Sequence, residues 1–275
     1  MNRTTIAWEI NARTDPHFAI LADNTKQGLW RTDDFFATGE REIDRVFAFM
    51  DDIGIKANIG GRFLDLGCGV GRNTRALMKR FSGGVGIDVS PTMICRARQY
   101  AENDPLKAEY VVNDGSNLPA IPSGSIDFLY CHIVLQHMQE KMQCQYVTEF
   151  MRVLAPEGTA AFQIPTGWTS CNPKVIFKTL TPFWIKNVYH TVMRRDITVR
   201  MEMHVLSPDV VQAICVDGGG VVISTPFTNS TEPDCNGSID FFDREEAIDR
   251  IARDTAKSQY LSQFFFVRKG AESLL

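Results

Sequence analysis

The stretch that decides the fold is Phe63-Leu64-Asp65-Leu66-Gly67-Cys68-Gly69-Val70-Gly71-Arg72-Asn73. A short apolar run leads into three glycines at alternate positions, and a helical pattern follows. Glycines at such a turn permit positive φ angles and let a ligand approach the backbone closely. The stretch therefore predicts a buried strand, a ligand-binding loop and a helix, at the edge where open α/β sheets bind ligands.

The spacing of these glycines disfavours two well-known phosphate loops. A dinucleotide fingerprint needs G-x-G-x-x-G, and its third glycine would fall where the chain has Arg72. A P-loop would need Gly-Lys-Ser/Thr at its end, which Gly71 and the two residues after it do not supply. Asp65 is also unfavourable beside a pyrophosphate, but it suits a cationic or amino-bearing ligand.

On both sides of the loop the sequence alternates between helical and strand patterns. Thr38 is expected to cap a helix over 40–55, and Ser90 with Pro91 is expected to begin another helix. Further helices are expected at 73–81, 141–154 and from 208 to about 217, and strands at 62–66, 85–89, 109–112, 126–131, 158–164, 221–225 and 259–268. This alternation predicts an α/β fold with a mostly parallel sheet and helices on both faces, and the last two strands are expected to pair antiparallel.

Acidic residues follow the second and third of these strands. Asp88 ends the second strand, where a carboxylate can accept both hydroxyls of a ribose. Asp114 follows the third strand and is placed to meet an adenine amino group. Any one of these acids, taken alone, is as readily a turn or cap residue. The ordered set Asp65, Asp88 and Asp114 points instead to a nucleoside ligand.

The amino-acid composition indicates which classes of partner and which cellular compartment to expect. The 275 residues carry 29 Lys and Arg against 33 Asp and Glu, a net charge of −4, without the basic excess typical of nucleic-acid binding. No apolar run approaches the ~20 residues of a membrane span, and no secretory signal is readable. Seven scattered cysteines without a C-x-x-C predict free thiols in a cytoplasmic protein, and no clustered ligands suggest a metal. We expect neither nucleic acid, membrane nor metal as a partner.

The segment Asp65–Gly71, followed by Asp88 and Asp114, resembles motif I and its successors in class I S-adenosylmethionine-dependent methyltransferases of the small-molecule, bacterial-like type. Ile126–His137 resembles the family's fourth strand and following loop, and Arg152–Thr159 resembles its helix-to-fifth-strand passage. The resemblance is strong over 40–165 and looser over 205–269. It implies a Rossmann-like, mostly parallel sheet of seven strands with one antiparallel strand, and S-adenosyl-L-methionine as cofactor.

The resemblance also implies a set of cofactor-binding residues. The glycine loop would pass under the methionyl and ribose parts, Asp88 would take the ribose hydroxyls, and the residues after the third strand would flank the adenine. Met93 would pack on the adenine face, although a core position explains it equally well. The full set is Asp65, Gly67, Cys68, Gly69, Gly71, Asp88, Val89, Met93, Asp114, Gly115, Ser116 and His132.

The acceptor is expected to be a small organic molecule methylated at oxygen or nitrogen. Residues 1–38 would form an N-terminal arm, 39–165 the cofactor-binding core, 166–206 an aromatic lid over the acceptor, and 207–275 the completion of the sheet. The alternatives for 166–206 are an ordinary helical elaboration and a basic amphipathic helix that contacts a membrane. No N/D-P-P-Y/F motif follows the fourth strand, which, by family resemblance, disfavours amide or exocyclic base nitrogens as acceptors.

A hydroxyl acceptor would need a base near neutral pH, and histidine is the usual choice. His132 and His137 follow the fourth strand and are the two candidates. The alternative is that His132 orders the loop and His137 packs beneath it. Two other functions stay open at this point: an NAD(P)-dependent oxidoreductase and a non-catalytic S-adenosylmethionine-binding protein. Acceptor identity and oligomeric state are not readable from the sequence.

Overall fold

The computed structural model of the protein describes residues 3–21, 28–102, 104–113, 115, 117–168, 202–230, 238–253 and 260–271. The strands are β1 (Arg62–Leu66), β2 (Gly83–Asp88), β3 (Glu109–Val112), β4 (Ile126–Cys131), β5 (Leu154–Trp168), β6 (Gly220–Ser224), β7 (Phe227–Thr228), β8 (Phe241–Phe242) and β9 (Tyr260–Lys269). The helices are α1 (Arg3–Thr14), α2 (Pro16–Ile20), α3 (Thr32–Asp52), α4 (Arg72–Met78), α5 (Pro91–Ala101), α6 (Glu140–Val153), α9 (Pro208–Asp217) and α10 (Arg244–Arg253), with a 3-10 turn η1 (Leu135–His137).

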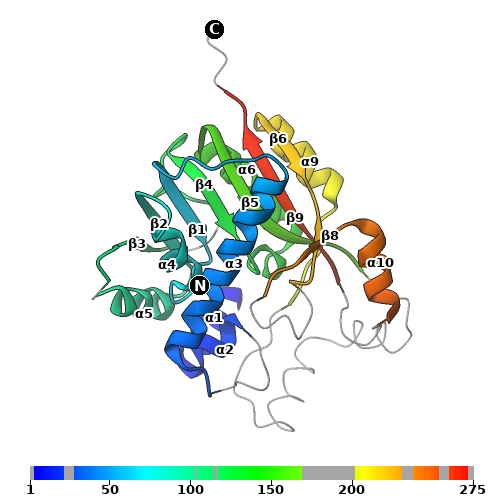
Figure 1. Ribbon diagram of the computed structural model, residues 1–275. Coiled ribbons are helices and arrows are strands. Elements are labelled where there is room, and N and C mark those ends of the chain that lie inside the picture. The colour runs from blue at the N-terminus through cyan, green and yellow to red at the C-terminus, as the bar shows by residue number, and fades with distance from the viewer. Residues whose placement is uncertain are drawn as a thin grey trace.

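All the described strands belong to one sheet in the order β3-β2-β1-β4-β5-β9-β7-β8, with β6 also paired to β9 (Figure 1). Neighbours from β3 to β5 are parallel, whereas β9 runs antiparallel to both β5 and β6. Seven of these strands have four or more residues, and β7 and β8 are two-residue additions at one edge. The predicted fold class, a mostly parallel α/β sheet with one antiparallel strand, is confirmed.

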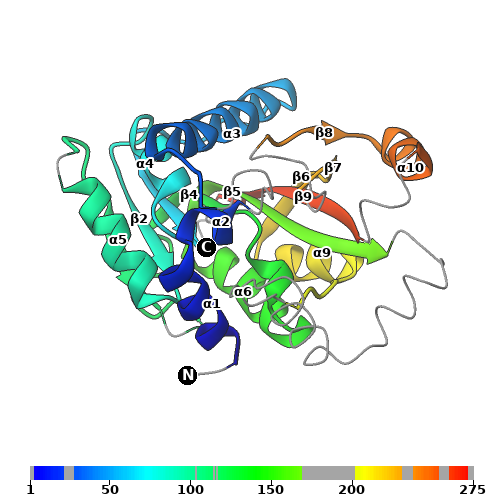
Figure 2. The same cartoon turned by 90° about the horizontal axis from the view of Figure 1, so that it is seen from below.

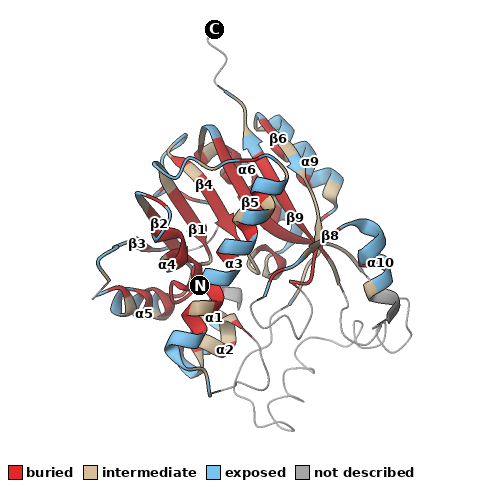
Figure 3. Cartoon of the chain, in the orientation of Figure 1, coloured by how far each residue is buried: buried red, intermediate tan, exposed pale blue. Residues whose placement is uncertain are grey.

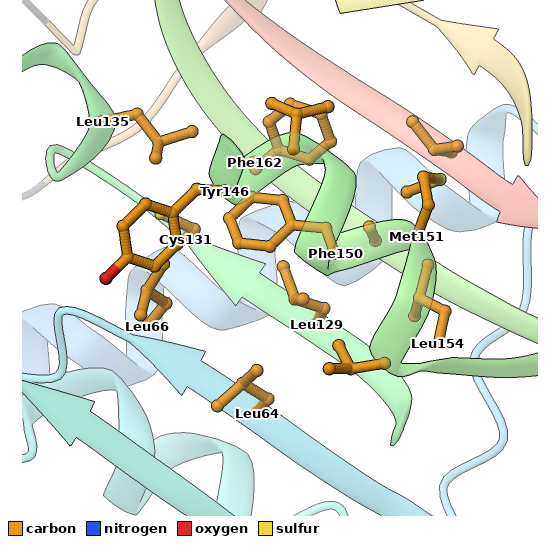
Figure 4. Packing of buried hydrophobic residues seen from close by; sticks show 14 of the residues in the cluster. Leu64, Leu66, Leu129, Cys131, Leu135, Tyr146, Phe150, Met151, Leu154 and Phe162 are labelled. Atoms are coloured by element: carbon orange, nitrogen blue, oxygen red, sulfur yellow. The ribbon is translucent and has the colours of Figure 1, made fainter. Parts of the chain in front are cut away.

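Alternate residues of the central strands pack into two hydrophobic cores, one on each face of the sheet. Phe128 on β4 packs toward α3 and α4, while Leu129 packs toward α6 and α9. Figure 4 shows part of the second core, where Phe150 of α6 lies among side chains of the sheet. The central strands are buried on both faces, as Figure 3 shows. Burying each large apolar side chain contributes about 1.5–3 kcal/mol, so helices cover both faces of this sheet.

Helix α3 begins earlier than the sequence pattern indicates, and Thr38 is not its N-cap. The helix starts at Thr32, and Asp33 and Asp34 occupy its first turn, where acids interact favourably with the helix dipole. Phe35 is fully buried, so the apolar face of the helix extends upstream of residue 40. Thr38 lies inside the helix and donates its hydroxyl to the Phe35 carbonyl at 2.6 Å. The predicted boundary between arm and core, 38/39, therefore falls within α3.

Helices α1 and α2 lie at the end of the sheet where the parallel strands finish (Figures 1 and 2). Asp15 caps α2, because its carboxylate accepts the Phe18 N–H at 3.1 Å. Most of the predicted lid, 166–206, lies outside the described residues, which resume at 202. The division of the chain into arm, core, lid and completing segment stays a prediction.

The crossing of α3 over the start of α4 depends on Gly39. A methyl group at Gly39 would lie 2.5 Å from the Arg72 carbonyl oxygen, too close for two packed backbones to accommodate. We expect Gly39→Ala to lower the free energy of unfolding by about 1–3 kcal/mol in urea titrations, although alanine is the better helix former. Gly83→Ala is the matched control. Nothing lies within 4 Å of its added methyl, so its effect should stay within about 0.5 kcal/mol. Equal effects would contradict this packing.

Candidate active site

The loop between β1 and α4 is held in a conformation that glycine favours. Gly67, Gly69 and Gly71 have φ angles of 75°, 54° and 87°, all in the left-handed region. A side chain at Gly67 would also collide with Val134, whose Cγ2 lies 2.2 Å from the position of an added Cβ. Glycine at position 67 thus lets the segment after β4 pack directly against the loop.

The backbone N–H groups of the loop are used within the protein. Gly67 and Cys68 both donate to the Ile87 carbonyl, at 2.7 and 3.0 Å. Gly71 donates to the Cys68 carbonyl at 2.9 Å, and Gly69 donates to a carboxylate of β2. A pyrophosphate-binding loop points such N–H groups at the phosphates. The observed hydrogen bonding therefore disfavours a pyrophosphate ligand at these four groups.

Asp88 joins the glycine loop to the start of α5. Its Oδ2 accepts the Gly69 N–H at 2.9 Å, and its Oδ1 accepts the Ser90 N–H at 2.8 Å. Burial raises the pKa of Asp88, and the hydrogen bonds from these backbone N–H groups oppose that rise. An ionised carboxylate has about four acceptor sites, so both oxygens retain capacity for hydroxyl donors from a ligand.

Asp65 lies beneath the same loop, at the end of β1. Its Oδ2 accepts the hydroxyl of Thr74 at 2.6 Å. Burial raises the pKa of Asp65 to about 7, and Asp88 and Glu42 raise it further while Thr74 and Arg72 lower it. Acids close together beside a buried loop favour a positively charged ligand.

The other predicted cofactor residues lie in three places. The Cys68 thiol is buried beside the loop, and burial raises its pKa well above the usual value, so it stays protonated. Val89 and Gly115 lie close together, because a methyl on Gly115 would be 4.0 Å from Cγ2 of Val89. Met93 is buried in the apolar cluster that includes Phe36. Asp114 and Ser116 lie outside the described residues.

A buried carboxylate that the sequence reasoning missed organises the region between the loop and β4. Glu42 of α3 is 1% exposed and accepts four hydrogen bonds. Arg72 donates to Oε2 at 2.8 Å, whereas Asn73, Tyr130 and His132 donate to Oε1 at 2.7, 2.7 and 2.8 Å. Glu42 lies four residues before Val46, on the apolar face of the helix. A glutamate among the apolar residues on one face of a predicted helix was the sequence signal that could have identified this buried carboxylate.

Glu42 is ionised despite its burial. Burial acts to raise its pKa, but the charge of Arg72, with the hydrogen bonds that Arg72 and His132 donate, holds the pKa well below the usual range. Tyr130 responds in the opposite sense: burial and the neighbouring carboxylate raise the pKa of its phenol, so the phenol keeps its proton.

The two candidate histidines have different surroundings. The His132 ring lies between Glu42 and Ser230, with its Nδ1 2.8 Å from Oε1 of Glu42 and its Nε2 2.7 Å from the hydroxyl oxygen of Ser230. His137 donates from Nδ1 to the Glu202 carbonyl at 3.0 Å, and its Nε2 lies 3.3 Å from the Gln136 amide nitrogen. Burial lowers the pKa of His137 to about 4.

The N-terminal helices cover the glycine loop. Glu9 of α1 accepts hydroxyl hydrogen bonds from Ser90 and Thr92 at 2.6 and 2.5 Å, which ties α1 to the start of α5. A methyl group at Gly69 would lie 2.6 Å from Cδ1 of Ile20, so α2 packs directly on the loop. Trp8 meets the ring of His137 edge-on, with 5.3 Å between ring centroids.

The central segment of the chain is similar to known methyltransferases. Residues 64–162 match the family model described as a methyltransferase domain. The 2-methyl-6-phytyl-1,4-hydroquinone methyltransferase of Synechocystis sp. is 34% identical over 100 residues, 36% of this chain and 30% of that protein. Phosphoethanolamine N-methyltransferase 3 of Arabidopsis thaliana is 28% identical over 152 residues, 51% of this chain and 30% of that protein. The chain thus covers less than a third of the length of either relative.

Solved structures share the fold. Magnesium protoporphyrin IX methyltransferase from Synechocystis PCC 6803, a structure with bound SAM, superposes with a TM-score of 0.55 at 15% identity over 98% of each chain. A putative sarcosine dimethylglycine methyltransferase from Galdieria sulphuraria gives a TM-score of 0.54 at 17% identity, over 86% of this chain and 85% of the other. At these identities the likeness concerns the fold alone.

Two kinds of feature are absent from the residues that the structure describes. No helix in these ranges is long and apolar enough to cross a membrane. Within the same residues, no group of three or more His, Cys, Asp and Glu side chains is arranged to hold a metal ion.

The pairing of Glu42 with Arg72 can be tested against an exposed ion pair. We expect Arg72→Met to lower the free energy of unfolding by about 3–5 kcal/mol, because it leaves the buried carboxylate without its cation. The control is Arg62→Met, which removes an exposed pair with Glu109 and should cost less than about 1 kcal/mol. Chemical denaturation measures both. A small effect at Arg72 would show that the carboxylate is not held ionised by that pair.

The raised pKa of Asp65 predicts a pH dependence of stability. Because the folded-state pKa of about 7 exceeds the unfolded value of 3.8, folding takes up a proton between about pH 4 and pH 7. The stability contributed by this side chain therefore falls as pH rises through that window. The difference in unfolding free energy between Asp65→Asn and wild type should shift in favour of the variant as pH rises. The exposed control Asp52→Asn should show no such trend, and a parallel trend in both variants would contradict the assignment.

Proposed function

We propose, on the premise that residues 64–162 are a methyltransferase domain of the class I type, that this protein transfers a methyl group from S-adenosyl-L-methionine to an oxygen or nitrogen of a small organic acceptor by in-line displacement. The observation that carries the proposal is the position of Asp88. Its carboxylate bridges the glycine loop and the start of α5 and keeps acceptor capacity on both oxygens, as a ribose site requires.

The strand order supports one orientation of the bound cofactor along the carboxyl ends of the strands. We propose that Asp88, after β2, binds the ribose hydroxyls, and that Val89 and Gly115, which lie close together near the ends of β2 and β3, flank the adenine. Asp114 and Ser116 join them in the proposal from the sequence alone. The methionyl end then points toward β1 and β4. There the loop residues Gly67, Cys68, Gly69 and Gly71 would lie beneath it.

The charge of the region supports the same ligand. S-Adenosyl-L-methionine supplies an electrophilic methyl group on a positively charged sulfur. Asp65 and Asp88 place negative charge next to the loop, and each carboxyl group would be more readily ionised beside a cation. The loop N–H groups are already bonded within the protein, which suits a ligand without phosphates. Met93 is buried in a core cluster, so we propose that it supports the site from below.

The chain's own residues would contribute positioning and, for a hydroxyl acceptor, proton removal. The loop and Asp88 would hold the donor, while α1 and α2 would exclude water from above it. In-line placement accounts for much of the rate in such reactions. His132 and His137 stay the proposed catalytic residues. His132 is the stronger candidate, because an ionised carboxylate holds its Nδ1, whereas burial lowers the pKa of His137 to about 4 and makes it a weaker base.

The acceptor is proposed only as a class. The hydroquinone, phosphoethanolamine and porphyrin named for the similar proteins differ too much in chemistry to assign one. The net charge of −4 supports a small molecule rather than nucleic acid. Free cysteines among the described residues agree with a cytoplasmic location, which we also propose.

Calorimetric titration with S-adenosylhomocysteine tests the cofactor site. We expect wild type to bind and Asp88→Ala to lose about tenfold or more in affinity, because the variant removes charged acceptors from the ribose and from the Gly69 N–H. Asp52→Ala, an exposed acid on α3, is the control and should bind like wild type. Circular dichroism checks that each variant is folded.

Thermal shift measurements separate the remaining functions. Stabilisation by NAD(P) but not by S-adenosylhomocysteine would replace the proposal with an oxidoreductase. Binding of S-adenosylhomocysteine, with no methylated product in a screen of acceptors, would favour a non-catalytic protein. Absence of binding by wild type, or unchanged binding by Asp88→Ala, would refute the proposed cofactor site.

A further inference from the structure

We propose that Glu42 is a positioning residue that holds His132 as the base for a hydroxyl acceptor, and that Ser230 occupies the place of the acceptor hydroxyl in the acceptor-free protein. This inference rests on the proposed methyltransferase function and deepens it, because it names the acceptor atom. Its basis is a continuous line of polar groups from α3 to β7, Glu42–His132–Ser230–Thr228, with distances of 2.8, 2.7 and 2.8 Å.

The tautomer of His132 follows from its partners. The ionised carboxylate of Glu42 can only accept, so the 2.8 Å contact requires Nδ1 of His132 to carry a hydrogen. In the neutral ring Nε2 is then a bare acceptor, and the Ser230 hydroxyl donates to it over 2.7 Å. The Thr228 hydroxyl in turn donates to the oxygen of Ser230. A ring oriented in this way presents its basic nitrogen to a hydroxyl.

The place of His132 in the sheet supports the role. The residue follows β4 directly, and β4 is the neighbour of β1, whose carboxyl end carries the glycine loop. The ring nitrogen Nε2 faces Ser230, in the segment that follows β7. If the ribose lies at Asp88 on β2, the methionyl end of the cofactor extends toward this strand. His132 would then border the space beyond the transferred methyl group.

The chemistry of the pair selects a hydroxyl over an amine. A neutral amine attacks a sulfonium methyl group without prior loss of a proton, whereas a phenol or alcohol is a weak nucleophile until its proton leaves. In the proposed step, Nε2 of His132 takes the hydroxyl proton and the oxygen forms the bond to the methyl carbon. The carbon–sulfur bond breaks with its electron pair on sulfur, and Glu42 stabilises the imidazolium that forms.

Ser230 competes for the same nitrogen. Nε2 has one lone pair and accepts one hydrogen bond, so an acceptor hydroxyl must replace that of Ser230. Ser230 itself is buried, with 6% of its surface exposed. The Ser230 hydroxyl therefore shows the kind of group, a neutral O–H donor, that the buried Nε2 accommodates.

The charged and titratable groups around His132 come from four elements. Glu42 of α3 contacts Nδ1, Tyr130 of β4 and Arg72 of α4 bind the same carboxylate, and Asp65 of β1 lies near Arg72 and Glu42. Phe264 of β9 is an apolar neighbour of the ring, with 5.6 Å between its ring centroid and that of His132. Among these described groups, Glu42 is the one that bonds the ring directly.

Nitrogen-15 NMR of the histidine rings tests the positioning role in the acceptor-free protein. In wild type near neutral pH we expect His132 as the Nδ1–H tautomer, with a strongly downfield Nδ1–H proton from its charge-assisted bond. In Glu42→Gln that proton should move upfield. The control is Glu40→Gln on the same helix, which removes an exposed pair with Lys79 and should leave the spectrum unchanged. An Nε2–H tautomer in wild type would overturn the proposal even if Glu42→Gln does not fold.

The acceptor class is tested by adding phenol, aniline or anisole to Ser230→Ala loaded with S-adenosylhomocysteine. Phenol should shift the His132 Nε2 resonance, more strongly than in wild type, and anisole should not. No response to phenol, or an equal response to aniline, would overturn the hydroxyl assignment. Calorimetry with S-adenosylhomocysteine distinguishes failure of this inference from failure of the proposed function. If the protein binds S-adenosylhomocysteine but His132 is the Nε2–H tautomer, only this inference is refuted. If His132 is the Nδ1–H tautomer but the protein does not bind S-adenosylhomocysteine, the proposed function is refuted.

Discussion

The buried carboxylate of Glu42 is the constraint on which the rest of the site depends. A buried charge costs several kcal/mol unless it is paired and fully hydrogen-bonded, so its partners must stay in place. Those partners come from the start of α4 and from the end of β4, and α3 carries the acid itself. One side chain thus fixes three elements around the glycine loop, and it orients His132 at the same time.

The second organising element is the pair of acids at the ends of β1 and β2. Asp65 lies below the loop, and Asp88 accepts hydrogen bonds from the loop and from the start of α5. Burial raises the pKa of both carboxyl groups. In the absence of a ligand this arrangement costs stability, since each carboxyl group loses hydration. A cationic ligand would recover part of that cost. The cofactor proposal therefore agrees with the electrostatics as well as with the methyltransferase-domain model that matches residues 64–162.

Much of the fold was predictable because its signals are local. The strands over 62–66, 109–112 and 126–131 match the expected ranges, and Ser90 caps α5 by accepting the Met93 N–H at 3.2 Å. The start of α3 was not predictable in the same way. Thr38 has the residue type of a cap, yet burial of Phe35 extends the helix past it. Tertiary packing outweighed the local preference there.

The sequence by itself determined the α/β fold, the glycine loop and the acids that follow successive strands. Strand periodicity, glycine spacing and acid position are all properties of short stretches of chain. Only the tertiary structure decided that Glu42, His132 and Ser230 form one line, because these residues are 90 and 98 positions apart and come from a helix, a strand end and an edge segment. No local pattern encodes such a contact, and packing of α3 against the sheet brings it about.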